Sequence, residues 1–270
     1  MTGELAGKVA VVLGGGSMGP GWGIGKAISA LFARAGARVA VVDRDVAAAE
    51  EAVERIALDG GAASAHDVDV ADDAALTGLL EELGGRLGGI DILHCNVGIG
   101  KAGPSAQISP AEWRRIADAN LVSLHVATTA VLPMMRTRGG GVVLTTSSIA
   151  GIRDVGYPHL AYGATKAAAI HFTRLFALEH AKDGIRANTI VAGLIDTPRI
   201  ETTLVGAYGS QSLDAMKAAR DSQCPLGRMG TAFEVAEAAL FLASPRASYI
   251  TGTEVVVDGG LSATIRQPIA

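Results

Sequence analysis

Two residues in the C-terminal half of the sequence have the types and spacing needed to move a proton. Tyr162 and Lys166 lie four residues apart in a segment with a helical pattern, so their side chains share one face, one turn apart. A phenol has an ordinary pKa of about 10 and is a weak base at neutral pH, but a neighbouring ammonium group favours its ionised form. The pair could therefore act as a general acid–base catalyst. The same spacing also occurs by chance on helix surfaces, so its meaning depends on the elements around it.

A glycine-rich segment, Gly14–Gly25, follows the first predicted strand and leads directly into a predicted helix. Glycine permits the positive φ angles of a tight strand-to-helix turn, and without a Cβ it lets a pyrophosphate approach the backbone N–H groups. The helix N-terminus adds unpaired donors and a partial positive charge. This placement predicts a dinucleotide phosphate site rather than a flexible surface turn.

Ser17, in the same segment, allows a competing interpretation. Residues 15–19 match the G-x-S-x-G pattern of the nucleophile elbow in α/β-hydrolases. Ser17 follows the first strand, however, so no earlier strand and loop can supply the second oxyanion donor, and no Asp and His evidently complete a triad. A serine hydrolase using Ser17 is kept as an alternative function.

The second predicted strand ends in Asp43, eighteen residues after Gly25. This is close to the spacing at which an acidic residue reaches the adenosine ribose. A carboxylate there can accept hydrogen bonds from both ribose hydroxyls, whereas it would repel a 2′-phosphate by about 4 kcal/mol at ~4 Å. Asp43 therefore predicts NAD rather than NADP. Arg44 could accommodate a 2′-phosphate, but we expect it to stack on adenine or face solvent.

Short runs rich in β-branched residues alternate with longer helical patterns along the chain. The predicted strands are Lys8–Leu13, Arg38–Asp43, Ala62–Asp67, Asp91–Cys95, Gly141–Thr146, Arg186–Val191 and Glu254–Val257. The predicted helices are Gly23–Ala35, Val46–Leu58, Asp72–Leu87, Pro110–Arg136, Ala161–Lys182 and Ala232–Leu242. Such alternation requires crossover connections and hence parallel strands, and the nearly continuous apolar strands indicate cover on both faces. We expect one α/β domain, residues 1–270, with a doubly wound, Rossmann-type parallel sheet of about seven strands and helices on both faces.

Composition narrows the class of protein. The 270 residues are 49% hydrophobic with 35 glycines, as expected for a compact chain with many turns. A net charge of −4 argues against nucleic acid as a partner, and Arg114–Arg115 is interpreted as a solvated helix face. No apolar stretch is expected to approach a membrane span, because the segment from Asn120 to Met135 contains His125 and Pro133, and the N-terminus lacks signal-peptide features. We therefore expect a cytoplasmic protein with no membrane partner.

The two cysteines, Cys95 and Cys224, are far apart and form neither a metal-spacing motif nor a disulfide framework. We expect buried, reduced thiols and no metal site.

In order and over essentially the whole chain, these motifs resemble those of the short-chain dehydrogenase/reductase family. The matching segments are Gly14–Gly25, Asp69–Val70, Cys95–Gly98, Asn120, Thr146–Gly151, Tyr162 with Lys166, Val191–Pro198 and Val257–Gly260. The resemblance implies hydride transfer between NAD and a secondary alcohol or ketone. A cofactor-binding regulator without turnover is the other alternative on this fold.

The resemblance also implies roles for individual residues. Tyr162 would transfer the proton, Lys166 would hold the nicotinamide ribose and lower the tyrosine pKa, and Ser148, rather than Ser147, would hydrogen-bond the reacting oxygen. Asn120 would hold a water that continues a proton relay from Lys166. The implied cofactor-binding residues are Gly14, Ser17, Gly23, Ile24, Gly25, Asp43, Arg44, Asp69, Val70, Asn96, Tyr162, Lys166, Ile195 and Thr197.

Two segments depart from the family pattern or interrupt the rhythm of strands and helices. The glycine loop is five residues longer than the family's usual loop, through an insertion before Gly23. We expect the insertion to bend over the pyrophosphate or towards the active-site opening, with Trp22 packed rather than exposed. The irregular stretch Asp196–Gly230 is the candidate substrate lid.

The substrate itself is not identified by any motif. Tyr157 and His159 could line the pocket or belong to a polar surface loop, and Arg153 or Arg199 could bind an anionic substrate group. Family members commonly pair the helices that carry Asn120 and Tyr162 across subunits, so the resemblance implies a homotetramer, with a dimer as the alternative.

Overall fold

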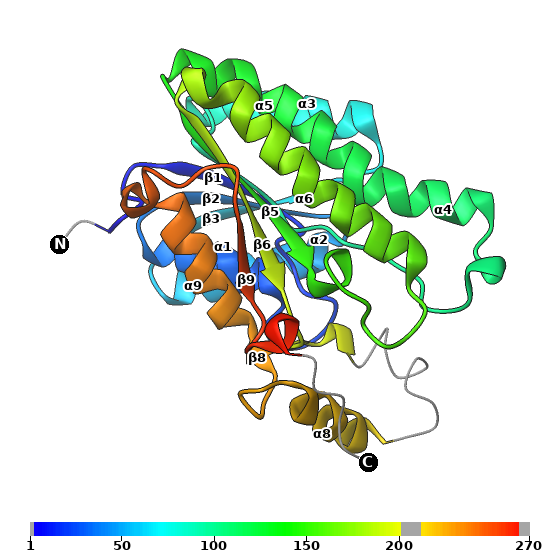
Figure 1. Cartoon of the computed structure of the whole chain (residues 1–270). Coiled ribbons are helices and arrows are strands. Elements are labelled where there is room, and N and C mark those ends of the chain that lie inside the picture. The colour runs from blue at the N-terminus through cyan, green and yellow to red at the C-terminus, as the bar shows by residue number, and fades with distance from the viewer. Residues whose placement is uncertain (1–2, 201–211, 265–270) are drawn as a thin grey trace.

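The computed structural model describes residues 3–200 and 212–264, and its centre is a seven-stranded parallel sheet. Figure 1 shows this sheet between two groups of helices, with the strands in the order β3-β2-β1-β4-β5-β6-β9. The strands are β1 (Val9–Leu13), β2 (Arg38–Asp43), β3 (Ala62–Asp67), β4 (Ile92–Cys95), β5 (Gly141–Ser148), β6 (Ile185–Ala192) and β9 (Glu254–Val257). The predicted doubly wound sheet is confirmed, and the predicted strand ends differ from these by no more than two residues.

Helices cover both faces of the sheet because each presents an apolar stripe to it. One face carries α1 (Ile24–Arg34), α2 (Val46–Leu58) and α9 (Ala232–Ala243). The other carries α3 (Asp73–Leu87), α5 (Ser123–Thr137) and α6 (Leu160–His180). Every residue of β1 is buried, as expected for a central strand between two helical layers.

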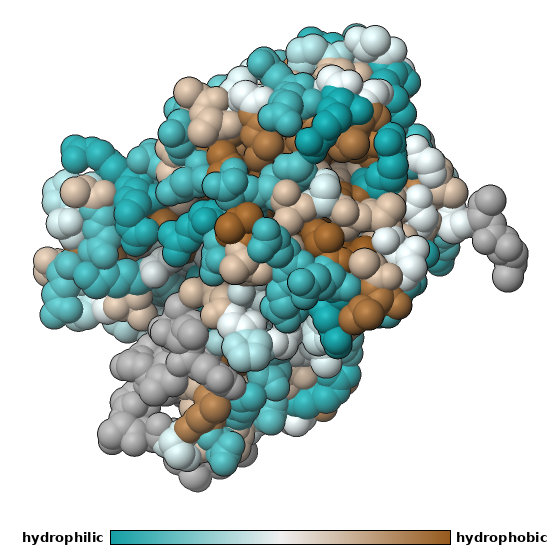
Figure 2. All heavy atoms as spheres, turned by 180° about the vertical axis from the view of Figure 1, so that it is seen from behind, coloured by the Kyte–Doolittle hydropathy of each residue, from teal (hydrophilic) through white to brown (hydrophobic). Residues whose placement is uncertain are grey.

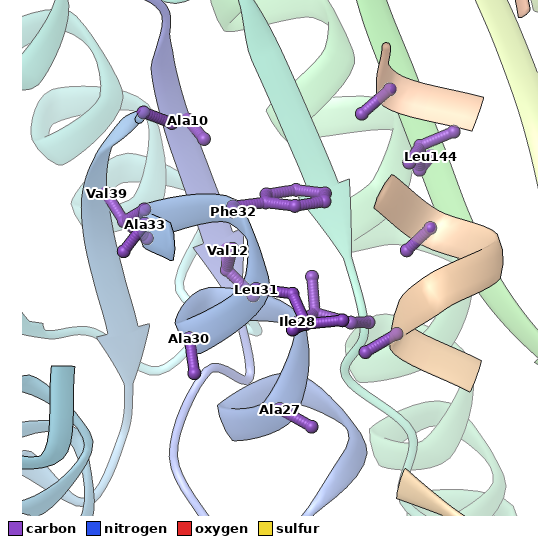
Figure 3. Close-up of a cluster of buried hydrophobic side chains, with 14 of the residues drawn as sticks. Ala10, Val12, Ala27, Ile28, Ala30, Leu31, Phe32, Ala33, Val39 and Leu144 are labelled. Carbon is purple, nitrogen blue, oxygen red and sulfur yellow. The ribbon is translucent and has the colours of Figure 1, made fainter. Parts of the chain in front are cut away.

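The close packing of α1 holds the glycine loop in place. Figure 3 shows Ile28 and Phe32 of this helix near the sheet, in a cluster that also contains Val12 and Leu144. Neither Ile28 nor Phe32 is accessible to solvent. Because the start of α1 is held against the strands in this way, the loop that leads into it has a defined position.

The helix predicted at Pro110–Arg136 is divided in the structure. It consists of α4 (Pro110–Ala117), a π-helical turn (Asp118–Val122) and α5. A π turn makes i→i+5 hydrogen bonds and so bulges out of a regular helix, and such turns often occur at functional sites. Asn120 lies in the middle of this turn.

The expectation that no apolar stretch approaches a membrane span was wrong. Within the described residues, the helical stretch from Pro110 to Thr137 is long and apolar enough to cross a membrane by length and composition alone. The core helix of a soluble protein passes the same test, and 44% of the apolar window is buried inside this structure, where α5 packs on α3 and the sheet. On the face seen in Figure 2, apolar residues form separate patches among hydrophilic ones.

The ends of the candidate lid are joined by a small second sheet that the sequence did not predict. β7 (Ile195–Asp196) pairs in parallel with β8 (Gly230–Thr231). Between them, α8 (Leu213–Gln223) begins at the Ser212 cap, and Ile200, Met216 and neighbouring apolar residues form a separate core cluster. Residues 201–211 of the predicted lid lie outside the described part of the chain.

Candidate active site

A cavity of about 570 Å³ opens at the carboxyl ends of the central strands. It lies where the strand order reverses, with β1 and β2 on one side and β4 and β5 on the other. Asn96 joins the two sides: its backbone N–H donates to the Leu13 carbonyl (2.9 Å) and its amide Nδ2 donates to the Gly14 carbonyl (2.9 Å). Ligands of doubly wound folds bind in the crevice at such a reversal.

The glycine loop forms one wall of the cavity and leaves no room for side chains at its closest contacts. A Cβ on Gly25 would overlap the Gly14 carbonyl oxygen, and a Cβ on Gly16 would lie 2.9 Å from the Asp43 carboxylate. Gly14 also has a φ of +74°, a conformation that favours glycine. The backbone here is therefore exposed to the cavity, and a phosphate could approach it closely.

Two further features of this loop fit a bound pyrophosphate. Gly23 caps α1 without a side-chain hydrogen bond, so the N-cap residue leaves the first N–H groups of the helix open to a ligand. The Ser17 hydroxyl is buried, and no described residue hydrogen-bonds to it. A buried hydroxyl beside an uncapped helix N-terminus matches the donor set that a dinucleotide phosphate requires.

The residues predicted to bind the cofactor all line this one cavity. Asp43, at the end of β2, accepts hydrogen bonds from the backbone N–H groups of Gly16 (3.1 Å) and Asp45 (3.2 Å), which fix its carboxylate beside the loop. Arg44 is exposed at the rim. The predicted lining residues are Gly14, Ser17, Gly23, Ile24, Gly25, Asp43, Arg44, Asp69, Val70, Asn96, Tyr162, Lys166, Ile195 and Thr197.

The two serines at the end of β5 have different surroundings. The hydroxyl of buried Ser147 donates to the Lys166 carbonyl (2.8 Å) and ties the strand to α6. Ser148 is half-buried, hydrogen-bonds to Tyr162 and accepts from the Ala150 N–H (3.2 Å). Since successive side chains of a strand alternate, the pleat gives Ser147 the structural position and Ser148 the position beside Tyr162.

Lys166 is buried one turn after Tyr162, and backbone carbonyls hold its ammonium group. Nζ donates to the carbonyls of Val97 (3.0 Å) and Thr146 (2.9 Å), and it lies 5.8 Å from the centroid of the Tyr162 ring. Burial lowers the pKa of Lys166, while the neighbouring Tyr162 acts in the opposite direction. These two bonds leave one of the three ammonium N–H groups for another partner.

Opposing effects act on the Tyr162 hydroxyl. Burial raises its pKa, but the charge of Arg199, then that of Lys166, and hydrogen bonds from Ser148 and Arg199 together lower the pKa below its usual value. Stabilising the phenolate in this way makes the side chain a better base near neutral pH.

Asn120 lies one layer behind the cavity rather than in its wall. Its amide Nδ2 donates to the carbonyl of Ile99 (2.8 Å) and to the Thr165 hydroxyl (2.9 Å), and its Oδ1 accepts from the Ile99 N–H (2.8 Å). Both amide N–H groups are therefore used. The side chain connects the π turn to α6 and to the loop after β4.

The insertion in the glycine loop packs against other parts of the protein, as expected for Trp22. The Trp22 ring makes an edge contact with Phe233 of α9 (centroids 4.8 Å apart), and the Lys26 ammonium lies 5.2 Å from its centroid. Earlier in the insertion, a Cβ on Gly19 or Gly21 would lie about 3.5 Å from the ring of Pro198. The insertion therefore extends from α9 to the start of the candidate lid.

The structure selects among the polar residues that the sequence left open. Tyr157 and His159 line the cavity, and the His159 ring stacks on Tyr162 with centroids 4.5 Å apart. The Arg199 guanidinium also lies over the Tyr162 ring, with Cζ 5.4 Å from the ring centroid. Arg153 instead donates to the Thr264 carbonyl (2.9 Å), away from the cavity wall, so it is not the predicted anion site.

Arg115 is a functional candidate that the sequence reasoning missed. The pair Arg114–Arg115 was interpreted as a solvated helix face, yet Arg115 is an exposed residue that also lines the cavity. Its place on the cavity wall depends on how α4 packs on α6, and no local signal in the sequence indicates that packing.

The remaining candidates do not form a second reactive centre. No described His or Asp side chain hydrogen-bonds to the Ser17 hydroxyl, so the hydrolase interpretation lacks a base. Cys95 and Cys224 are both buried as expected, and burial raises the pKa of Cys95 to about 12. Within the described residues, no group of three or more His, Cys, Asp or Glu could hold a metal ion.

Known proteins resemble this chain over nearly its full length. Residues 19–262 match the family model described as Enoyl-(Acyl carrier protein) reductase. The 7alpha-hydroxysteroid dehydrogenase of Escherichia coli K12 is 35% identical over 258 residues, 95% of each chain. A crystal structure of a short-chain type dehydrogenase/reductase from Mycobacterium marinum has a TM-score of 0.86 and 34% identity, covering 96% of this chain and 97% of that one. A structure assigned as an NAD(P)-dependent gluconate 5-dehydrogenase from Beutenbergia cavernae, with NADP bound at low occupancy, has a TM-score of 0.85 and 33% identity, covering 96% and 98%.

Proposed function

Because the chain belongs to the short-chain dehydrogenase/reductase family, we propose that it transfers hydride between NAD(H) and a secondary alcohol or ketone, with Tyr162 as the acid–base. The observation that carries the proposal is the contact of Tyr162 with Ser148 inside the cavity that the glycine loop also lines. The bound nicotinamide would supply or accept the hydride. The residues of the chain would orient the substrate and move the proton.

In this proposal Ser148 and Tyr162 bind the reacting oxygen of the substrate together. In alcohol oxidation the lowered pKa of Tyr162 favours the phenolate that removes the hydroxyl proton; in ketone reduction the phenol returns it. Lys166 would contribute its third N–H to the nicotinamide ribose while its charge stabilises the phenolate.

The π turn that carries Asn120 would support a proton relay through its backbone rather than through the Asn120 amide. A second cavity of about 10 Å³ lies between Asn120 and Lys166, and Ser123 and Thr145 contribute to its lining. A site of roughly this size can hold one water, which needs two to four polar partners. The amide N–H groups of Asn120 are already used, so we assign the contact with that water to the backbone of the π turn.

We assign NAD as the preferred cofactor because of the acidic side chains at the adenosine end. Asp43, oriented by Gly16 and Asp45, would accept from the ribose hydroxyls and repel a 2′-phosphate. Asp45 and Asp69 add two more carboxylates to the same end of the cavity. Arg44 is the one residue in this turn whose charge would favour NADP.

We also propose self-association into a homotetramer through the helices that carry the π turn and Tyr162. In support, α6 exposes three large apolar side chains, Leu160 (53% exposed), Leu175 (52%) and Leu178 (66%), and the last two share one helical face. Light scattering coupled to size-exclusion chromatography would measure the mass in solution, and a mass of four chains is expected.

A spectrophotometric assay tests the proposed reaction. Purified protein is mixed with NAD or NADH and a panel of secondary alcohols and ketones, and the absorbance of the reduced nicotinamide is followed. Turnover with NAD(H) is expected on part of the panel. Binding of NADH without any turnover would favour a regulator, and ester cleavage that disappears in Ser17→Ala would favour a hydrolase.

A further inference from the structure

Arg199 has a defined position at the catalytic end of the cavity. The chain is anchored on both sides of it: Ile200 is 2% exposed in the apolar cluster formed mainly by the candidate lid, and Pro198 lies against the insertion in the glycine loop. Arg199 is half-buried, its Cζ lies 5.4 Å from the centroid of the Tyr162 ring, and it hydrogen-bonds to that side chain. Its guanidinium group is therefore held beside the group that exchanges the proton.

Charge is unevenly distributed along the cavity wall. All the carboxylates among the described lining residues lie at the adenosine end, either on the last residue of β2 or in the turns that follow β2 and β3: Asp43, Asp45 and Asp69. The charged lining residues elsewhere in the cavity, again among those described, are cationic: Arg115, Lys166, Arg199 and Arg220. An anionic group placed near Tyr162 would meet the positive charges of Lys166 and Arg199, and none of the described lining residues at that end is a carboxylate.

The neighbouring His159 does not add to this positive charge at neutral pH. Burial, and then the charge of Arg199, lower the pKa of His159 to about 4. Its neutral ring stacks on Tyr162 and also lies 5.5 Å from the ring of Tyr157, centroid to centroid. The aromatic side chains thus offer an apolar wall beside Arg199, suited to the carbon skeleton of a small substrate.

Guanidinium and carboxylate groups are geometrically matched. The planar fork of Arg can donate two parallel hydrogen bonds to a carboxylate, and this geometry makes Arg the usual residue for such recognition. Because Arg199 reaches the side chain of Tyr162, a carboxylate a few bonds from the carbinol carbon could bind the guanidinium while the hydroxyl faces Tyr162 and Ser148.

We propose that Arg199 binds an anionic group of the substrate, so that hydroxy acids and oxo acids are the preferred substrate class. This inference rests on the proposed function, because it names the substrate of the same site. Arg153, the other arginine of this region, is directed to the Thr264 carbonyl and has no part in it.

A binding experiment tests the proposal without requiring turnover. The protein is loaded with NADH, whose dihydronicotinamide ring is uncharged, and titrated with butyrate or with its neutral isostere butyramide while nicotinamide fluorescence is recorded. Butyrate should bind at least about tenfold more tightly than butyramide, since charge-assisted hydrogen bonds are roughly twice as strong as neutral ones. Equal binding of the two ligands would overturn the proposal.

Variants identify the residue responsible for that difference. Arg199→Gln should remove the preference for butyrate by weakening butyrate about tenfold or more while leaving butyramide nearly unchanged, and Arg199→Lys should retain part of it. Arg153→Ala removes the same charge outside the cavity and should behave as the unmodified protein. An equal loss for both ligands in Arg199→Gln would instead mean that Arg199 only positions Tyr162, and the proposal would be rejected.

Turnover measurements show whether the anionic substrate class or the dehydrogenase activity itself is the proposal that fails. Rates with 3-hydroxybutyrate and with its methyl ester are compared using NAD, and the acid is expected to have the higher kcat/KM. Turnover of the ester at an equal or higher kcat/KM would reject the anionic substrate class but leave the dehydrogenase proposal intact. Butyrate binding through Arg199 without oxidation of any alcohol would support the anion site and reject the dehydrogenase proposal.

Discussion

The two ends of the cavity differ in charge and in how the chain builds them. The adenosine end is formed by the glycine loop and by turns that directly follow neighbouring strands, with Asp43 held by two backbone N–H groups. The catalytic end combines side chains of β5, α6 and the segment after β7, and cations dominate it. The same crevice can therefore hold the uncharged hydroxyls of a ribose at one end and select an anionic substrate at the other.

The two ends also differ in the kind of substitution that would impair them. At the adenosine end the ligand would approach backbone atoms, so an added Cβ does the damage. At the catalytic end the chemistry depends on single functional groups whose positions are fixed by contacts distant in sequence, such as that of Lys166 with Val97.

The largest effect is expected at the catalytic end, from Tyr162→Phe. Removing only the hydroxyl takes away the proton donor and acceptor, and general acid–base catalysis of this kind contributes roughly 10²–10⁴ in rate. We expect kcat to fall by about that factor while fluorescence titration shows nearly unchanged NADH affinity. Tyr249→Phe, at a fully exposed tyrosine, is the matched control. A near-normal kcat in Tyr162→Phe would remove Tyr162 from the mechanism.

The contrast between the two ends also determines what could be predicted from the sequence. The glycine loop, Asp43 and the Tyr162–Lys166 pair depend on spacing within a single strand, turn or helix, and the structure places them in one cavity as expected. The nearly continuous apolar strands likewise predicted the sheet, because a strand covered by helices on both faces must be apolar on both.

The features that escaped prediction depend on contacts between segments far apart in the chain. Arg153 and Arg199 were equal candidates for an anion site, and only the path of the chain after β7 places one of them over Tyr162. Arg115 lines the cavity because α4 packs on α6, the helix that carries Tyr162. The π turn at Asn120 was missed because its residues fit the apolar pattern of a continuous helix.

At the adenosine end, Gly25→Ala should cause the largest loss. The new methyl group would overlap the Gly14 carbonyl and lie 2.7 Å from the Asn96 amide, so the loop must shift. Overpacking of this kind typically costs about 1–3 kcal/mol of unfolding free energy, and we expect NADH affinity to fall with it. Urea unfolding and fluorescence titration measure the two effects.

A second glycine provides the control for that substitution. Gly78 lies exposed within α3, and a Cβ there would meet no atom within 4 Å. Gly78→Ala should leave NADH affinity unchanged and raise stability by up to about 1 kcal/mol, because alanine favours the helix. If Gly25→Ala behaved like Gly78→Ala, backbone approach at the glycine loop would not explain its composition.

His94 allows a test of the electrostatics beneath the catalytic end. It is fully buried on β4, with Nε2 2.8 Å from the Thr146 hydroxyl. Burial, and then the charge of Lys166, lower its pKa to about 3, against 6.5 for an ordinary histidine. Between these values the unfolded chain binds a proton that the folded chain does not, so this contribution to stability is complete above pH 6.5 and is lost as the pH falls.

For His94 the expected loss between pH 7 and pH 5 is about 2 kcal/mol of unfolding free energy. His94→Gln should remove that part of the acid sensitivity, as measured by urea unfolding at the two pH values. His171→Gln, at an exposed position on α6, should keep the pH dependence of the unmodified protein. An unchanged pH dependence in His94→Gln would show that this histidine is not held neutral by the fold.

The smallest expected effect concerns cofactor choice at the acidic end. Asp43→Ala removes the carboxylate that would meet a 2′-phosphate and leaves Arg44 in place, so the preference for NAD over NADP should fall by about tenfold. This is less than the unscreened repulsion would give, because the site is partly exposed to water. The ratio of kcat/KM values with the two cofactors measures the effect.

Asp69→Ala removes an equal charge from the same end, but from the turn after β3, and should change the ratio much less. A similar shift in both variants would mean that general acidity of this end, rather than a direct contact with Asp43, discriminates between the cofactors.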